Sequence, residues 1–328
     1  MPETQTNILM VGPSGVGKTS LLTAMSERMA AEAALIGCNF FARGNTGTTL
    51  LKKRDQLRAL VEKGGILPAE NESLDGDRER TDYIFDVDVD PKAQNGPEFS
   101  LRLTDVPGGW FTGDGAPDGL LQDSHLSFIV VDTNALLEQP RKKDRYGRFH
   151  HTINRPDLVT NFYKRELGRG RSQTNGQPHF VVFVLVRAES YMDKVVRREE
   201  MRRALIESYK DLLDLFAIYG IRSKASVIKT IGGIRFNHFE EVEPPGGGDR
   251  IPVARFMALK EVGYKPELCD VPLKLALCHG AETRQNGTDF VDTMLDLLGW
   301  GIKPRLRDFA GKVLSNLNSD WVIDLQRL

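Results

Sequence analysis

The chain of 328 residues has little cysteine and almost no excess charge. Its three cysteines, Cys38, Cys269 and Cys278, lie far apart without Cys-x-x-Cys spacing, which excludes a disulfide framework and the common zinc motifs. The formal net charge is −1, so the chain as a whole does not attract nucleic acid or acidic membranes. We therefore expect reduced core thiols and do not expect nucleic acid as a partner.

Long hydrophobic stretches are absent too. No apolar run approaches the roughly 20 residues that span a bilayer, and the polar segment Met1 to Asn7 is unlike a secretory signal peptide. We expect a cytoplasmic protein without membrane contact. Hydrophobic residues make up 40 % and charged residues 27 %, which is ordinary for globular proteins and permits one large domain or two smaller ones.

One complete motif is present near the start of the chain. The apolar run Ile8–Val11 precedes Gly-Pro-Ser-Gly-Val-Gly-Lys-Thr at Gly12–Thr19, and a helical pattern follows. Glycines let successive N–H groups face an anion, and the helix adds the positive end of its dipole. This order of elements indicates a loop that binds a nucleoside triphosphate. The residues expected at the nucleotide are Gly12, Ser14, Gly15, Val16, Gly17, Lys18, Thr19 and Ser20.

Side chains with distinct chemistry occur in this loop and in a later segment. Lys18 should reach the β- and γ-phosphates, and the Thr19 hydroxyl should hold Mg²⁺. Asp105 ends a predicted strand and would bind Mg²⁺ through a water molecule. Gly108, three residues later, offers a backbone N–H that can approach the γ-phosphate without an intervening side chain.

The pattern of strands predicts the fold class. Tyr83–Val89 and Phe99–Asp105 alternate apolar and polar residues across a short connection with turn residues, so they should be antiparallel. The apolar runs Leu126–Asp132 and Phe180–Val186 are typical of buried parallel strands. We predict a three-layer α/β phosphate-loop NTPase fold with a mostly parallel sheet, one antiparallel edge hairpin and a C-terminal helical extension.

The domain prediction follows from these elements. Residues 1–235 should form the nucleotide-binding domain, with a helical insertion at about 50–64, and residues 236–328 a loop and an extension packed on it. Further expectations are a loop over Phe40–Thr49, one helix over Met192–Ile218, a last strand over Ala225–Ile231, an exposed loop over Phe239–Arg250, and helices over Asp289–Leu298, Leu306–Leu317 and Ser319–Leu325.

Phosphate loop, hairpin and Asp-Val-Pro-Gly together resemble GTPases of the translation-factor-related (TRAFAC) class, which includes the small regulatory GTPases. The resemblance covers about the first 130 residues well and the next 100 loosely. The inserted helix and altered later motifs are similar to bacterial double-GTPase-type proteins. The resemblance implies a Mg²⁺-dependent GTP switch with low intrinsic turnover, which contacts a protein partner or a second copy through its switch regions.

The base-binding motif of that class, Asn/Thr-Lys-x-Asp, is altered here to Val186-Arg187-Ala188-Glu189. By resemblance, Glu189 would accept two hydrogen bonds from guanine and Arg187 would stack on the purine. Val186 lacks the polar side chain that tethers the phosphate loop in the family. A plain surface turn is the alternative for this segment. GTP is favoured over ATP.

The catalytic residues are the least defined part of the site. Gly109 occupies the position of the family's water-positioning glutamine, so hydrolysis should be slow or depend on a partner, a second subunit or a loop such as the basic segment 141–145. Thr81 is the candidate switch threonine and Mg²⁺ ligand. The rival threonines are Thr46, Thr48 and Thr49. A nucleotide-binding scaffold without useful turnover, or an ATPase, remains an alternative function.

Overall fold

The computed structural model describes residues 4–67, 79–89, 99–112, 117–138, 149–169, 179–193, 195–243, 250–285, 302–317 and 319–325. The strands are β1 (Thr4–Val11), β2 (Asn39–Ala42), β3 (Gly65–Ile66), β4 (Thr81–Asp88), β5 (Phe99–Asp105), β6 (Leu126–Asp132), β7 (Phe180–Val186), β8 (Arg222–Val227), β9 (Ile234–Val242), β10 (Ile251–Ala258) and β11 (Val322–Asp324). The helices are α1 (Lys18–Glu32), α2 (Asn45–Lys63), α3 (Thr133–Leu137), α4 (Phe149–Ile153), α5 (Pro156–Gly168), α6 (Val195–Ser208), α7 (Lys210–Tyr219), α8 (Val271–Gln285) and α10 (Ile302–Ser315), with short 3-10 turns η2 (Gly108–Thr112) and η3 (Ser319–Trp321).

An eight-stranded sheet forms the centre of the molecule, in the order β11-β8-β7-β6-β1-β5-β4-β2. Strand β1 is parallel to β5 and β6, and β6, β7 and β8 continue the parallel arrangement. Strands β4 and β5 are antiparallel, with Thr81 opposite Asp105. The predicted α/β class, mostly parallel sheet and antiparallel pair are confirmed.

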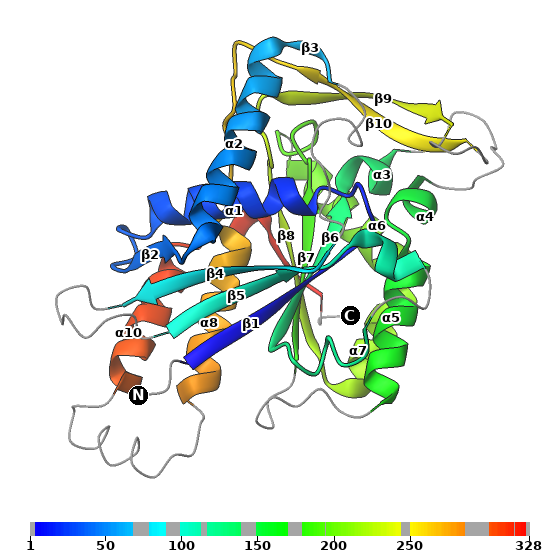
Figure 1. Cartoon of the computed structure of the whole chain (residues 1–328). Coiled ribbons are helices and arrows are strands. Elements are labelled where there is room, and N and C mark those ends of the chain that lie inside the picture. The colour runs from blue at the N-terminus through cyan, green and yellow to red at the C-terminus, as the bar shows by residue number, and fades with distance from the viewer. Residues whose placement is uncertain are drawn as a thin grey trace.

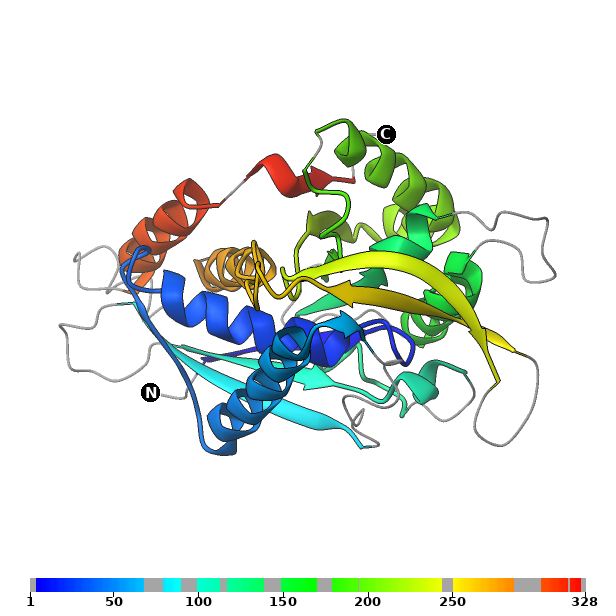
Figure 2. The ribbon, with the colours of Figure 1, turned by 90° about the horizontal axis from the view of Figure 1, so that it is seen from above.

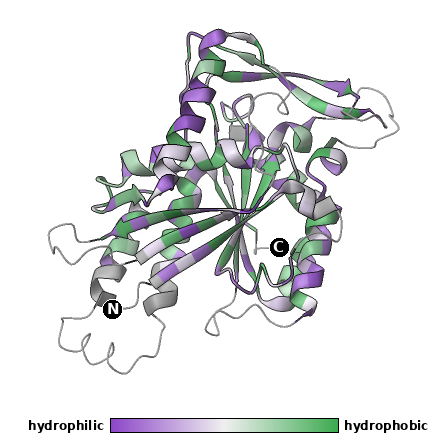
Figure 3. Ribbon diagram, viewed as in Figure 1, coloured by the Kyte–Doolittle hydropathy of each residue, from purple (hydrophilic) through white to green (hydrophobic). Residues whose placement is uncertain are grey.

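Helices cover both faces of the sheet, which gives three layers (Figure 1). One hydrophobic core joins the sheet to α1, α8 and α10, and a second joins its other face to α5, α6 and α7. The central strands β6 and β7 are mostly hydrophobic, as the green at the centre of the sheet in Figure 3 shows, because both of their faces are buried. The phosphate loop leaves the carboxyl end of β1 in the middle of this sheet.

A second, three-stranded sheet lies outside the central one, in the order β3-β10-β9. Its long β9–β10 hairpin arches away from α2 toward α4, as Figures 1 and 2 show together. A third hydrophobic core joins α2 to the hairpin and to the segment after β8; it contains Leu57, Val61, Ile231, Ile234, Ala254 and Phe256. Two chain segments far apart in sequence therefore form one packed unit.

Several expected elements differ from those observed. Phe40 lies on β2 and not in a loop, because this strand pairs with the outer edge of β4 and the rings of Phe40 and Phe85 stack at 4.9 Å. The predicted hairpin therefore lies one strand in from the edge. The inserted helix begins at Asn45, since the Thr46 hydroxyl accepts a hydrogen bond from the Ile84 N–H at 3.1 Å and so fixes its first turn to β4.

The later part of the chain differs more from the elements expected from the sequence. The helical pattern over 192–218 is divided at Tyr209, whose backbone (φ −112°, ψ 22°) leaves the helical region, so two helices replace one. Residues 239–242 belong to β9, not to a loop, and 319–325 form η3 and β11, not a helix, because β11 pairs with the edge strand β8. The helix expected over 289–298 lies outside the described residues. No helix in the described part of the chain is long and apolar enough to cross a membrane.

Candidate functional site

The phosphate loop connects β1 to α1, as its motif predicts. Gly15 (φ 82°) and Gly17 (φ 100°) adopt the left-handed backbone that favours glycine, and α1 begins at the next residue, Lys18. Ser14 and Gly15 are exposed, whereas Val16 and Ser20 are buried. The exposed backbone of the loop therefore lies at the positive end of the α1 dipole, which is an arrangement that binds anions.

The Lys18 side chain folds back over the loop. Its ammonium group donates to the Gly12 carbonyl at 2.8 Å and to the Pro13 carbonyl at 3.2 Å. Burial lowers the pKa of Lys18, and the negative charge of Asp105 opposes that effect. The ammonium is thus held beside the loop and close to the carboxylate that we expect to bind Mg²⁺.

The second loop of the site lies directly against the phosphate loop at Gly108. A Cβ atom added to Gly108 would be 2.0 Å from the Ser14 nitrogen and 2.5 Å from the Pro13 carbonyl carbon. A Cβ added to Gly109 would meet nothing within 4 Å. Only glycine fits the first position, whereas the second faces open space and could hold a side chain.

The three residues expected at Mg²⁺ come from three elements. Thr19 is in the first turn of α1, Asp105 ends β5, and Thr81 begins β4. Asp105 pairs in register with Thr81 on one side and with Met10 of β1 on the other. Directly opposite residues of an antiparallel pair share one face of the sheet, so Thr81 and Asp105 lie side by side next to the phosphate loop.

The rival switch threonines lie on α2. Thr46 is buried, and its hydroxyl accepts the Ile84 N–H, so it holds α2 to the sheet. Thr48 is exposed and Thr49 is partly exposed. Among the four threonines, Thr81 is the one directly opposite Asp105 in the register of β4 and β5.

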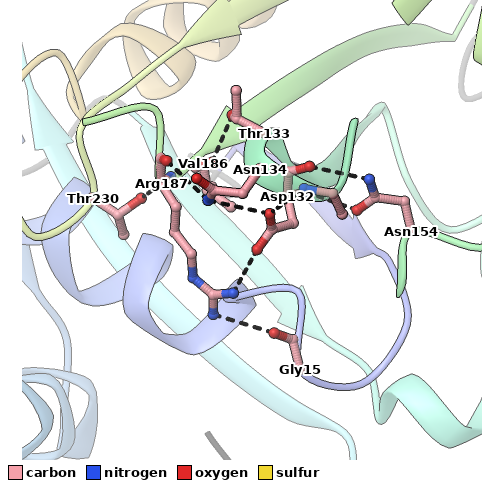
Figure 4. Close-up of polar contacts among 9 residues, drawn as sticks. Gly15, Asp132, Thr133, Asn134, Asn154, Val186, Arg187 and Thr230 are labelled. Atoms are coloured by element: carbon pink, nitrogen blue, oxygen red, sulfur yellow. Dashed lines mark hydrogen bonds and ion pairs between the residues drawn. The ribbon is translucent and has the colours of Figure 1, made fainter. Parts of the chain in front are cut away.

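Arg187 reaches the phosphate loop from the end of β7 (Figure 4). One terminal guanidinium nitrogen, Nη1, lies 2.6 Å from the Asp132 carboxylate, and the other, Nη2, donates to the Gly15 carbonyl at 3.2 Å. Nη2 is also 3.2 Å from the position that a Cβ on Gly17 would take. Arg187 has a left-handed backbone (φ 58°), and its N–H donates to the Thr230 hydroxyl at 3.1 Å. The side chain tethers the phosphate loop to two strand ends.

Asp132 ends β6 and is completely buried. Its side chain also caps α3 by accepting the Ala135 N–H at 2.9 Å, while the Asn154 amide pairs with both backbone groups of Asp132. Burial lowers the pKa of Arg187 to about 10, and the charge of Glu189 opposes that effect, so the guanidinium stays protonated at neutral pH. The result is a buried ion pair beside the phosphate loop.

Glu189 is buried, two residues after Arg187. Its Oε1 atom accepts the N–H groups of Ile231 at 2.9 Å and Gly232 at 3.2 Å. Its Oε2 atom is buried and has no hydrogen-bond partner within the described part of the chain. Burial raises the pKa of Glu189, and the bound N–H groups and Arg187 oppose that effect.

Asn134 also belongs to this network, since its amide donates to the Asp132 carboxylate at 3.3 Å and to the Arg187 carbonyl at 3.2 Å. Four members were not predicted as part of the site from the sequence, namely Asp132, Asn134, Asn154 and Thr230. The signal available for Asp132 was its place at the carboxyl end of a buried parallel strand, where such side chains gather in an α/β sheet. Asn154 and Thr230 are ordinary loop and strand-end residues by pattern. The basic segment 141–145, considered as a source of a catalytic arginine, lies outside the described residues.

Comparison with known proteins gives limited matches. No protein-family model and no curated protein matches the chain. The crystal structure of the S. cerevisiae Ski7 GTPase-like domain bound to GTP aligns with a TM-score of 0.40 and 13 % identity, covering 70 % of this chain and 43 % of that one. The same domain bound to GDP and inorganic phosphate aligns with a TM-score of 0.38 at the same identity and coverage. The chain thus spans less than half the length of these structures.

Proposed function

We propose that this chain binds GTP together with Mg²⁺ at the phosphate loop, hydrolyses it slowly and acts as a molecular switch. The observation that carries the proposal is the convergence of three charged or anion-binding features on one point of the sheet. These are the exposed loop backbone at the start of α1, the Lys18 ammonium within it, and Asp105 beside Thr81. A bound triphosphate needs this set of donors, cation and Mg²⁺ ligands.

The residues present fit such a ligand. Lys18 would bind the β- and γ-phosphates, Thr19 and Asp105 would hold Mg²⁺, and the Gly108 N–H would approach the γ-phosphate where the loops already touch. Mg²⁺ would neutralise phosphate charge when bound. Gly109 supplies no side chain to orient water, which supports slow turnover. Loss of the γ-phosphate would release the contacts of Gly108 and Thr81, and this release is the proposed switch.

The preference for guanine is supported by the buried oxygen of Glu189. Guanine offers N1–H and a 2-amino group as donors, whereas adenine offers neither at these positions, so adenine would leave the Oε2 atom unsatisfied. Inosine triphosphate keeps N1–H and lacks the 2-amino group. The affinity should therefore be highest for GTP, lower for ITP and lowest for ATP. Each lost charge-assisted hydrogen bond should lower the affinity by roughly 10- to 150-fold.

Competition binding with a fluorescent GTP analogue tests the base assignment. Glu189→Gln should bring the three affinities together, because the neutral amide no longer favours two donors. Equal affinity of the wild-type protein for GTP and ATP would contradict the assignment of guanine, and tighter binding of ATP than of GTP would support the alternative of an ATPase.

The second candidate function is a nucleotide-dependent scaffold without turnover. It is favoured by Gly109, which has no side chain to orient water and faces open space. The two functions differ in phosphate release. The switch predicts release that is slow, requires Mg²⁺ and is abolished by Lys18→Ala. The scaffold predicts bound triphosphate that stays intact over hours.

A further inference from the structure

The side chains assigned to the nucleotide base are covered in the structure. Arg187 is 6 % exposed and Glu189 8 %. The terminal nitrogens of the guanidinium are engaged by Asp132 and by the Gly15 carbonyl. A purine that stacks on Arg187 therefore has to use a flat face of the guanidinium, since its terminal edge is already hydrogen-bonded.

Phe256 of β10 contacts this guanidinium. The Arg187 Cζ atom lies 5.5 Å from the centroid of the Phe256 ring, and Phe256 is itself only 6 % exposed. This distance is that of a cation–π contact, in which the ring face covers the cation. A Cβ on Gly17 would lie 3.2 Å from Nη2 and 3.5 Å from Cζ and Nε, so the phosphate loop also lies against this guanidinium. A purine and a phenyl ring are both flat π-systems that bind a face of a guanidinium, so a purine on the face that Phe256 covers competes with its ring.

Phe256 belongs to a larger packed unit. Its carbonyl accepts the Leu67 N–H at 2.8 Å, and β10 pairs with β3 at the end of α2. Its side chain packs in the third core with Leu57 and Val61 of α2. We call α2, β3, β9 and β10 together the cap. The first turn of α2 is bonded through Thr46 to β4, the strand that begins with Thr81.

We propose that Phe256 limits the entry of the nucleotide by occupying the place of the base on Arg187, so that an entering base displaces Phe256 and opens the cap. The proposal rests on the proposed nucleotide binding and adds the residue that controls access. Phosphates reach the exposed loop at Ser14 and Gly15 without this displacement. The base reaches its place on Arg187 only after Phe256 is displaced. Base binding is thereby linked through α2 to the strand that carries the switch threonine.

Stopped-flow association of a fluorescent GTP analogue tests the proposal with the full chain. Phe256→Leu keeps an apolar side chain in the third core and removes the ring; association should become roughly 2- to 30-fold faster, as expected from the loss of one cation–π contact. The matched control is Phe239→Leu, which makes the same exchange on the same hairpin, since Phe239 lies on β9 with its ring 4.1 Å from that of Phe149. The control should leave the association rate within about twofold.

A ligand without a base separates phosphate binding from the displacement of Phe256. Inorganic tripolyphosphate should bind the wild-type protein and Phe256→Leu with equal affinity, because it needs no displacement. Amide hydrogen exchange of β9 and β10 in the wild-type protein should become faster when GTP binds, which keeps the test valid if a variant folds poorly.

Three results would overturn the inference: an unchanged or slower association rate for Phe256→Leu, equal acceleration by Phe239→Leu, or slower exchange of β9 and β10 with GTP. If the wild-type protein binds neither GTP nor tripolyphosphate, the proposed function fails instead. If Lys18→Ala abolishes GTP binding but Phe256→Leu changes nothing, the proposed function stands and only this inference is lost.

Discussion

Two neighbouring glycines should respond very differently to the same substitution. A methyl group on Gly108 would lie 2.0 Å from the Ser14 nitrogen, 2.4 Å from its Cα and 2.5 Å from the Pro13 carbonyl carbon, whereas one on Gly109 meets nothing within 4 Å. The three obstructing atoms are all backbone atoms, so no side-chain rotation relieves the contact. Since carbon atoms in contact lie about 3.5 Å apart, Gly108→Ala must separate the two loops by roughly 1 to 1.5 Å.

This separation should change both stability and binding. Forced overpacking of this kind lowers the free energy of unfolding by about 1–3 kcal/mol, whereas Gly109→Ala should stay within about 0.5 kcal/mol. Displacing the Gly108 N–H would remove the hydrogen bond that we propose it donates to the γ-phosphate, and a hydrogen bond to a charged group is worth about 1.5–3 kcal/mol. The affinity for GTP should therefore fall by roughly 10-fold or more, while the affinity for GDP changes little.

Urea denaturation and calorimetric titration with GTP and GDP, each with Mg²⁺, measure these effects for the wild-type protein and the two alanine variants. Gly109→Ala is the matched control, because it adds the same methyl group one residue away. Equal behaviour of the two variants would refute the close packing of Gly108 on the phosphate loop. Equal loss of GTP and GDP affinity in Gly108→Ala would refute its contact with the γ-phosphate.

Three further predictions concern catalysis, the buried ion pair and pH. Gly109→Gln should raise the rate of phosphate release at least about 10-fold, because the open position admits a water-orienting side chain; Gly109→Leu, which fills the same space, should not. Arg187→Met leaves Asp132 buried without its cation and should lower the free energy of unfolding by about 3–5 kcal/mol, and a loss below 1 kcal/mol in urea would contradict the pair. Burial lowers the pKa of His179 to about 3 in the folded protein. Between about pH 6.5 and pH 3, the imidazole of His179 therefore binds a proton in the unfolded chain but not in the folded one. Stability should therefore fall with decreasing pH by about 1.4 kcal/mol per unit from this group, and His179→Asn should reduce that slope in urea titrations at pH 5 to 7.

The elements that local chemistry specifies were predicted well. The strand, loop and helix around Lys18 follow from glycine backbone freedom and helix dipoles, which act within a few residues. The antiparallel pairing of β4 and β5 follows from a connection too short for a parallel crossover. Strand β7 follows from its unbroken apolar run and β6 from a mostly apolar one, because both faces of a central parallel strand are buried.

The elements that depend on distant partners were missed. Strand β2 forms because β4 offers an open edge, and β11 forms because β8 does, so neither is apparent from its own few residues. The β9–β10 hairpin is stabilised by α2, which lies about 170 residues earlier in the chain. The buried residues Met201, Leu205, Tyr209, Leu212 and Phe216 keep a helical spacing across the end of α6 and the start of α7, so the pattern gives no sign of the break.

The same distinction applies to the site. Arg187 was singled out by its position after β7, but its bonds to Asp132 and to the Gly15 carbonyl join residues that are 55 and 172 positions apart. Periodicity and motif spacing act over much shorter ranges. The meeting of parallel strands at one edge of the sheet brings such residues together, and only the strand order β7-β6-β1 determines which of them meet.

The central claim is that the phosphate loop binds GTP with Mg²⁺. Calorimetric titration of the wild-type protein, Lys18→Ala and the control Lys210→Ala tests it most directly, since Lys210 is exposed on α7 and far from the loop in sequence. We predict saturable binding of one GTP per chain that is kept in Lys210→Ala and lost in Lys18→Ala. Binding of equal affinity in Lys18→Ala, or no binding of any nucleoside triphosphate by the wild-type protein, would contradict the claim.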